Sequence, residues 1–180
     1  SDFTLGGFVE NLTLVGQLSM TGIGNGRDNV ITGGDAGDLL DGRGGLDTLI
    51  GGNGDDLYVI DRYAEIARLV ELPDAGSDIL GIRFSNGPKA APMVLALDGT
   101  IATLANFEGI DLAGAGGRFD VTGNERANSL TGNGAGSVLR GLDGDDLFYG
   151  AAGVDTFIGG VGDDRYTISA PGTRIVENAG

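Results

Sequence analysis

A nine-residue repeat that always begins with glycine sets the strongest limit on how this chain can fold. Residues 24–59 divide into four consecutive blocks: GNGRDNVIT, GGDAGDLLD, GRGGLDTLI and GGNGDDLYV. Residues 123–167 divide into five more: GNERANSLT, GNGAGSVLR, GLDGDDLFY, GAAGVDTFI and GGVGDDRYT. The sixth position of every block is Asp, Asn or Ser, and the eighth is a large apolar or aromatic residue. A short fixed period of this kind indicates a solenoid whose coils pack only against their neighbours.

Each part of the block has a physical role in such a solenoid. Glycines let the first six residues adopt positive φ angles, so the backbone can bend and its carbonyl groups can converge. The last three residues can then form a short strand with the eighth side chain pointing inward. Two blocks complete one coil, so we expect alternate blocks to stack 18 residues apart. The sequence therefore predicts an all-β fold with its core at the eighth positions.

The composition excludes several classes of protein. The chain of 180 residues has 36 Gly, 26 acidic and 11 basic residues, a net charge of −15, and no His, Cys or Trp. It therefore lacks a serine–histidine triad, a cysteine nucleophile, zinc ligands of the His or Cys type, and disulfides. The negative charge argues against binding to nucleic acid. No apolar run approaches the ~18 residues of a membrane span, and a hydrophobic content of 41% is too high for a disordered acidic tail.

The blocks resemble the RTX (hemolysin-type) calcium-binding nonapeptide GGxGxDxUx, in which U is a large apolar residue. The blocks at 51–59 and 159–167 match every fixed position, whereas the others lack a glycine or replace the Asp with Asn or Ser. The resemblance implies a right-handed parallel β-roll, here as two tandem arrays with irregular, strand-rich flanks. It also implies Ca²⁺ as the bound metal, which agrees with a loop that offers only oxygen ligands.

In the family that the chain resembles, each ion lies between two stacked loops. One loop supplies the carbonyls of its second and fourth positions, the other those of its first and third, and both supply the sixth side chain. Carried over by position, the implied sites are Asn25, Arg27 and Asn29 with Gly42, Gly44 and Asp47; Gly34, Ala36 and Asp38 with Gly51, Asn53 and Asp56; Asn124, Arg126 and Asn128 with Gly141, Asp143 and Asp146; and Leu142, Gly144 and Asp146 with Gly159, Val161 and Asp164.

The number of carboxylates should order these sites by affinity. The two sites with paired Asp residues should bind most tightly, and those containing Asn29 or Asn128 less tightly. Ser137 with Asp155 is the poorest pair, because a hydroxyl replaces an anion. Asp47 could also pair with Glu65 if residues 60–68 are a degenerate tenth block. We expect about four ions, within a range of two to six, and poor competition by Mg²⁺.

The arrays sit within a longer duplication. Residues 10–14 (ENLTL) before the first array parallel residues 108–112 (EGIDL) before the second, and residues 68–71 (RLVE) parallel residues 174–177 (RIVE). We therefore expect leading strands at 1–23, a first array at 24–68, a strand-rich spacer with further leading strands at 69–122, a second array at 123–167 and the start of another spacer at 168–180. The spacer has strand-like runs at 79–84, 93–97 and 110–112, and no segment predicts a helix.

These features favour a non-enzymatic, calcium-folded structural module of a longer bacterial protein, secreted or on the cell surface, of the stalk, adhesin or surface-layer type. The resemblance implies export through type I secretion machinery, and a glycan or cell-surface target stays open. The alternative is the calcium-binding tail of a secreted protease, lipase or alginate epimerase whose catalytic domain lies elsewhere. A polysaccharide lyase is more distant, since neither Arg83 nor Lys89 has the context of a catalytic base.

Overall fold

The computed structural model describes residues 2–85, 87, 91–151, 153–169 and 171–177. It divides into two compact units, residues 1–81 and 82–180. Both units are built from short parallel strands, which confirms the predicted all-β solenoid of the β-roll type. Helix is confined, within the described residues, to two 3-10 turns, η1 (Tyr63–Arg68) and η2 (Ala102–Leu104).

The first unit has two stacks of parallel strands. One stack contains β1 (Asp2–Thr4), β3 (Thr21–Ile23), β5 (Leu39–Asp41) and β7 (Leu57–Ile60). The other contains β2 (Asn11–Thr13), β4 (Val30–Thr32), β6 (Thr48–Ile50) and β8 (Leu69–Val70). Strand β9 (Ile79–Ile82) ends the unit, and the N–H of Ile79 donates to the carbonyl of Asp56. The chain therefore alternates between two sheets, one strand per block.

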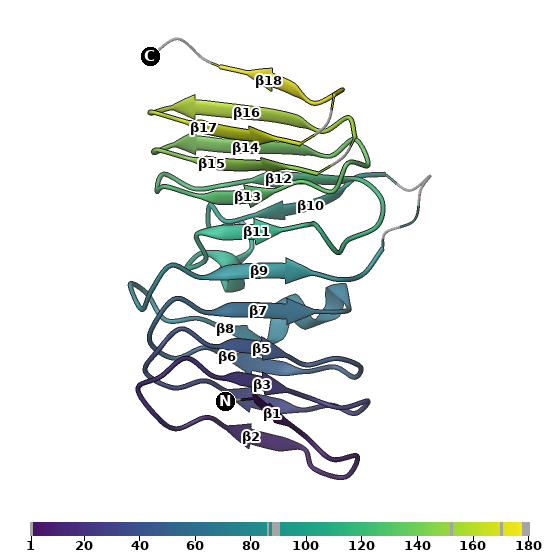
Figure 1. Cartoon of the computed structure of the whole chain (residues 1–180), viewed down its shortest axis with the longest axis vertical. Coiled ribbons are helices and arrows are strands. Elements are labelled where there is room, and N and C mark those ends of the chain that lie inside the picture. The colour runs from purple at the N-terminus through teal and green to yellow at the C-terminus, as the bar shows by residue number, and fades with distance from the viewer. Residues whose placement is uncertain (1, 86, 88–90, 152, 170, 178–180) are drawn as a thin grey trace. The chain divides into compact units, whose positions relative to one another are not determined.

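The second unit repeats this arrangement. Strands β11 (Gly109–Asp111), β13 (Ser129–Thr131), β15 (Leu147–Gly150) and β17 (Arg165–Ile168) form one stack. Strands β10 (Met93–Ala96), β12 (Phe119–Thr122), β14 (Val138–Asp143), β16 (Thr156–Val161) and β18 (Arg174–Val176) form the other. Figure 1 shows β14 to β17 as successive rungs, drawn in green to yellow.

The register confirms the predicted stacking interval. Leu40 pairs with Tyr58 and Ile31 with Leu49 in the first unit, and Phe148 pairs with Tyr166 in the second, each 18 residues apart. Eighth-position side chains therefore lie directly above one another. In the first array these side chains are buried at every block. In the second array they are buried at every block except the last, where Tyr166 is half-buried.

Aromatic residues at the eighth position extend this core in the second unit. The rings of Phe148 and Tyr166 stack with centroids 5.0 Å apart, and those of Phe148 and Phe157 lie 5.3 Å apart. By contrast Tyr149, at a ninth position, is 42% exposed. The eighth-position aromatics are thus core residues, as their phase predicts, rather than a surface for stacking sugars.

The strands expected between the arrays also form. The runs at 79–84, 93–97 and 110–112 correspond to β9, β10 and β11, each shorter or shifted by a residue or two. Their inward side chains, including Leu80, Leu95 and Ile110, are fully buried. The segment that could have been a degenerate block, residues 60–68, bends into η1 after β7. The spacer therefore continues the solenoid pattern with less regular turns.

Candidate metal centre

The sixth-position side chains form a ladder of hydrogen bonds inside each array. In every predicted pair, the backbone N–H of one sixth-position residue donates to the side chain of the sixth-position residue in the next coil. The donor and acceptor pairs are Asn29 to Asp47 (2.7 Å), Asp38 to Asp56 (2.6 Å), Asn128 to Asp146 (2.8 Å), Ser137 to Asp155 (2.9 Å) and Asp146 to Asp164 (2.9 Å). The structure therefore places the two sixth-position residues of each predicted site, and of the Ser137 pair, next to each other in successive coils.

Glu65 extends the ladder in the first array. The N–H of Asp47 donates to Glu65 Oε1 (3.2 Å), while Oε2 accepts from the N–H groups of Asp61 (3.0 Å) and Arg62 (3.1 Å). Glu65 is buried, and it also caps the start of η1. The degenerate block thus places a carboxylate in the sixth-position row even though its backbone differs from the other blocks.

The first-position glycines make room for these oxygens. A Cβ at Gly33 would meet the carbonyl oxygen of Gly51 and the side chain of Asp38, and a Cβ at Gly141 would overlap Asp146 Oδ2 and meet the carbonyl of Gly159. The same crowding holds at Gly24 and Gly123, which are the first positions of the other two predicted sites. At each site, the loop's own sixth side chain and the next coil's first carbonyl therefore converge on one glycine.

Positive φ angles occur at both the second and the fourth positions of four loops, those that begin at Gly42, Gly51, Gly141 and Gly159. Leu142 occupies a second position with φ of 90°, a conformation that costs a non-glycine residue about 1–3 kcal/mol. The loops that begin at Gly24, Gly33 and Gly123 have no positive φ at these positions. The backbone of the loops therefore differs among blocks.

The buried carboxylates differ in how their second oxygen is satisfied. Asp38 Oδ2 accepts from the N–H of Gly34 (2.7 Å), and Asp155 Oδ2 accepts from that of Gly134 (2.7 Å). Four other Asp residues in the ladder have an Oδ2 atom that no hydrogen-bond donor reaches within the described part of the chain. They are Asp47, Asp56, Asp146 and Asp164. A buried carboxylate oxygen without a donor is costly unless a cation lies beside it.

Burial perturbs the acidity of the same residues. Burial raises the pKa of Asp47 to about 7, and the neighbouring carboxylate of Glu65 adds to the shift. Burial likewise raises the pKa of Asp56 to about 7 and that of Asp146 to about 6, with further contributions from nearby carboxylates. The pKa of Asp164 is also raised, chiefly by burial. These groups favour the neutral form unless a positive charge compensates them.

Several carbonyls predicted as ligands also join the coils to one another. The carbonyl of Asn25 accepts from the N–H of Gly44 (3.1 Å), that of Gly34 from Asn53 (3.1 Å), and that of Val161 from Gly144 (2.9 Å). A carbonyl oxygen has a second lone pair, so these bonds hold the facing loops in register and leave each oxygen able to bind a cation.

The two asparagines at sixth positions bind the preceding coil. Asn29 Nδ2 donates to the carbonyl of Val9 (3.1 Å), and Asn128 Nδ2 donates to that of Glu108 (3.3 Å). Both residues belong to the first block of an array. An amide NH₂ group therefore satisfies carbonyls at the start of each array, where a carboxylate would be repelled.

The exposed acids at fifth positions act outside the ladder. Asp55 Oδ1 accepts from the N–H of Ser77 (2.8 Å), and Asp145 Oδ1 accepts from that of Asp163 (2.9 Å). These bonds link coils at the surface, which agrees with a supporting role rather than direct metal ligation.

Sequence reasoning missed two buried carboxylates, Asp78 and Glu71. Asp78 lies 22 residues after Asp56, and its Oδ1 accepts from the N–H of Asp56 (2.8 Å). It therefore continues the sixth-position ladder. The interval between Asp56 and Asp78 is four residues longer than the 18 residues between the other ladder pairs, so the periodic pattern does not predict it. Glu71 lies in the RLVE segment, whose duplication was the available signal.

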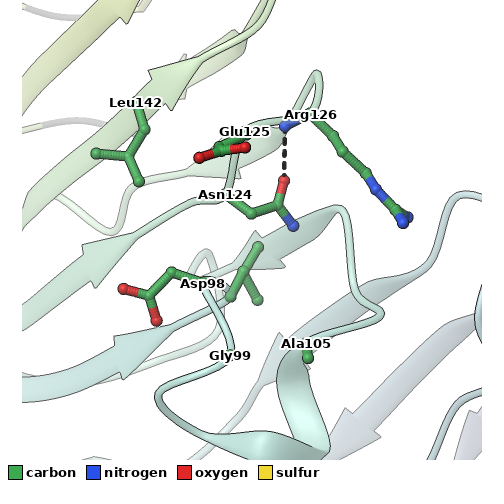
Figure 2. A pocket seen from close by; sticks show the side chains of 8 residues that line it. Asp98, Gly99, Ala105, Asn124, Glu125, Arg126 and Leu142 are labelled. Atoms are coloured by element: carbon green, nitrogen blue, oxygen red, sulfur yellow. Dashed lines mark hydrogen bonds between the residues drawn. The ribbon is translucent and has the colours of Figure 1, made fainter.

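A surface cleft of about 570 Å³ lies beside the first loop of the second array. Figure 2 shows Asn124, Glu125 and Arg126 on one side of it, with the N–H of Arg126 bonded to Asn124 Oδ1 (3.0 Å), and Leu142 nearby. Asp98, Gly99 and Ala105 also line the cleft. The cleft thus adjoins a predicted calcium loop, and it holds exposed polar groups rather than the buried carboxylates of the ladder.

Comparison with known proteins identifies the repeats. The family model for the RTX calcium-binding nonapeptide repeat matches residues 23–58 and 131–166, in four copies. No curated protein and no solved structure gave a significant match. Residues 123–130 lie outside the match, yet Asn128 joins the ladder and Leu130 is buried like the other eighth-position residues. No described helix has the length and apolar character needed to cross a membrane.

Proposed function

We propose that this chain, which carries RTX (hemolysin-type) calcium-binding nonapeptide repeats, is a structural module that folds when it binds calcium. Its parent would be a secreted or cell-surface bacterial protein, with this module in a stalk, adhesin or surface layer. The proposal places two modules in the chain, with arrays at residues 24–68 and 123–167. It assigns no catalytic step to this chain, so turnover of alginate or pectate by the purified chain would count against it.

One observation carries the proposal. Four Asp side chains, of which Asp164 is half-buried and the others buried, present a buried oxygen that no described donor satisfies, and each lies in the row where successive loops meet. Ca²⁺ accepts six to eight oxygen ligands at about 2.3–2.6 Å, from carboxylates and carbonyls alike. The converging carbonyls at the first-position glycines supply neutral oxygens of the right kind. A divalent cation between the loops would satisfy both sets.

The same physics explains how such a module would be exported. Without calcium, stacked carboxylates repel each other and a glycine-rich backbone loses much entropy on ordering. Binding and folding are then one event. The chain would stay unfolded in the low calcium of the cytosol, pass through a type I secretion channel, and fold in the millimolar calcium outside.

We expect about four bound ions, at the four predicted sites. Among these four loop sites, the tightest should be the two with paired carboxylates, Asp38 with Asp56 and Asp146 with Asp164. In the other two sites one partner is Asn29 or Asn128, so a single carboxylate faces the ion. Binding at Ser137 and Asp155 should be weakest, because a neutral hydroxyl replaces one of the two carboxylates.

A pair of matched variants tests the assignment by calorimetric calcium titration. Asp146→Asn removes a carboxylate that belongs to two predicted sites, so we expect the loss of at least one ion from the measured stoichiometry. Asp145→Asn makes the same chemical change one residue away, at an exposed side chain, and should leave the stoichiometry unchanged. Equal stoichiometry in the two variants would contradict the proposal.

A further inference from the structure

We propose that Asp56, Glu71 and Asp78 form an additional calcium site that lies outside the nonapeptide period and closes the first array. The inference rests on the proposed function for the identity of the cation. It adds a different kind of site, however, since two of its three ligands come from the segment after the repeats.

The three carboxylates converge in the interior of the first unit. One oxygen from each lies within 4.8 Å of the others. Their residues are 2%, 8% and 1% exposed for Asp56, Glu71 and Asp78. Three buried carboxylates this close repel one another strongly when ionised, and a divalent cation held between them removes the repulsion.

Asp56 gives an independent indication that a ligand is required. Its Oδ1 accepts from the N–H of Asp38, whereas its Oδ2 is buried and has no donor among the described residues. A Cβ built on Gly51 would meet three groups at once, Asp56 Oδ2, Glu71 Oε2 and the hydroxyl of Tyr58. The unsatisfied oxygen of Asp56 is therefore aimed at the same point as Glu71.

Tyr58 is a positioning residue for Glu71. Its hydroxyl lies within hydrogen-bonding distance of both Glu71 Oε2 and the carbonyl of Val70, and it accepts from the N–H of Gly51. The other oxygen of Glu71, Oε1, accepts from the N–H of Leu72 (2.7 Å). The carboxylate of Glu71 is thus held in one orientation before any cation arrives.

The second unit repeats the arrangement independently. A Cβ on Gly159 would meet Asp164 Oδ2, the hydroxyl of Tyr166 and Glu177 Oε2. These residues correspond in order to Asp56, Tyr58 and Glu71 around Gly51. The second unit thus repeats the convergence of two carboxylates and a tyrosine hydroxyl on one glycine, whereas the cluster of three carboxylates is seen, among the described residues, in the first unit.

Calcium is the cation that this cluster fits best. All three ligands are hard carboxylate oxygens, which favour Ca²⁺, Mg²⁺ or Mn²⁺ over softer metals. Mg²⁺ demands a near-ideal octahedron at ~2.0–2.1 Å and gives up its water reluctantly, so it should occupy a site built from three protein carboxylates less well than Ca²⁺. Because affinity rises with the number of carboxylates, this site should bind more tightly than the loop sites.

Native mass spectrometry of the calcium-loaded chain tests the inference by counting ions. In the double variant Glu71→Gln/Asp78→Asn we expect one calcium ion fewer than in the parent chain. Asn at position 78 keeps an oxygen that can accept from the N–H of Asp56, and Gln at position 71 keeps an oxygen for one of the two hydrogen bonds that Glu71 accepts. Asp74→Asn is the matched control, since it removes an exposed carboxylate from the same segment and should retain every ion.

The outcomes separate this inference from the proposed function. If the double variant binds as many ions as the parent chain, the inference is wrong and the loop sites stand. If the parent chain binds no calcium, both fail.

If the double variant does not fold, a measurement on the parent chain tests whether a cation binds among the three carboxylates. In crystals soaked with Tb³⁺ as a calcium substitute, we expect an anomalous peak among Asp56, Glu71 and Asp78. Peaks at the loop sites without one there would overturn the inference.

Discussion

Gly141 illustrates how closely the residues of one loop depend on each other. A side chain at this position would overlap Asp146 Oδ2 and press on the carbonyl of Gly159. Because its neighbours here are backbone and a buried carboxylate, neither can move aside cheaply. The requirement for glycine at this first position is therefore steric, whereas at Gly52 and Gly160 it comes also from positive φ.

We expect Gly141→Ala to destabilise the calcium-bound fold by about 1–3 kcal/mol, the usual cost of overpacking. It should also weaken calcium binding, since the methyl group displaces Asp146 Oδ2. Gly26→Ala is the control, because nothing lies within 4 Å of a Cβ at Gly26. Thermal unfolding in saturating calcium measures both variants, and equal midpoints would contradict the steric account.

We expect Asn128→Asp to destabilise the metal-free fold but to strengthen calcium binding. In Asn128→Asp the side chain can no longer donate to the carbonyl of Glu108 or to Asn124 Oδ1. This loss should destabilise the metal-free folded state by about 1–3 kcal/mol, so the calcium-free variant should show no more β signal than the parent chain. With calcium, the new carboxylate pairs with Asp146, so the variant should bind the ion more tightly than the parent chain.

A matched control separates the two effects. Asn133 Nδ2 also donates to carbonyls of the preceding coil, those of Ala115 and Gly117, but it lies at a second position. Asn133→Asp should therefore be destabilised without any rescue by calcium. Calcium titrations followed by circular dichroism measure both variants, and equal rescue in the two would count against a ligand role for position 128.

At the scale of strands and loops, the sequence predicts most of what forms. The nine-residue phase specifies the loops, the three-residue strands and the inward eighth position, because each block must bury its own apolar residue against its neighbours. The spacer is less predictable, since its alternation is weak. Residues 63–68 form a 3-10 turn that depends on Glu65 accepting from Asp61 and Arg62, a contact that no periodicity reveals.

Part of the metal centre could not be predicted from the sequence. The phase identifies Asp38 and Asp56 as equivalent, yet only Asp38 has its Oδ2 bonded to an N–H of its own loop. Asp78 is equivalent to both, but the longer connection between it and Asp56 breaks the period. Position along a repeat therefore predicts which side chains turn inward, and only the folded backbone determines which oxygens a cation must satisfy.

At the scale of the whole molecule, the buried carboxylates couple stability to pH. The folded pKa values of Asp47 and Asp56, about 7, and of Asp146, about 6, exceed the ordinary 3.8. Between about pH 4 and pH 7 the calcium-free folded chain therefore binds more protons than the unfolded chain. Its stability must fall as the pH rises through that window.

We accordingly expect the calcium-free chain, which should be largely unfolded at pH 8, to gain β signal at pH 5. In saturating calcium the order should reverse, with the fold more stable at pH 8, because protons compete with the ion for the same oxygens. The triple variant Asp47→Asn/Asp56→Asn/Asp146→Asn removes the titrating groups and should reduce the dependence of the calcium-free signal on pH. Circular dichroism in metal-depleted buffers provides the comparison, and a calcium-free chain that gains β signal toward pH 8 would refute this coupling.

Divalent ions bound between the glycine-rich coils should provide most of the free energy that stabilises the fold. Far-ultraviolet circular dichroism of the purified chain, first in excess chelator and then with added calcium, measures this directly. We predict a largely unfolded spectrum in chelator and a cooperative gain of β signal with calcium that an equal concentration of magnesium does not reproduce. A full β spectrum in chelator, unchanged by calcium, would contradict the account.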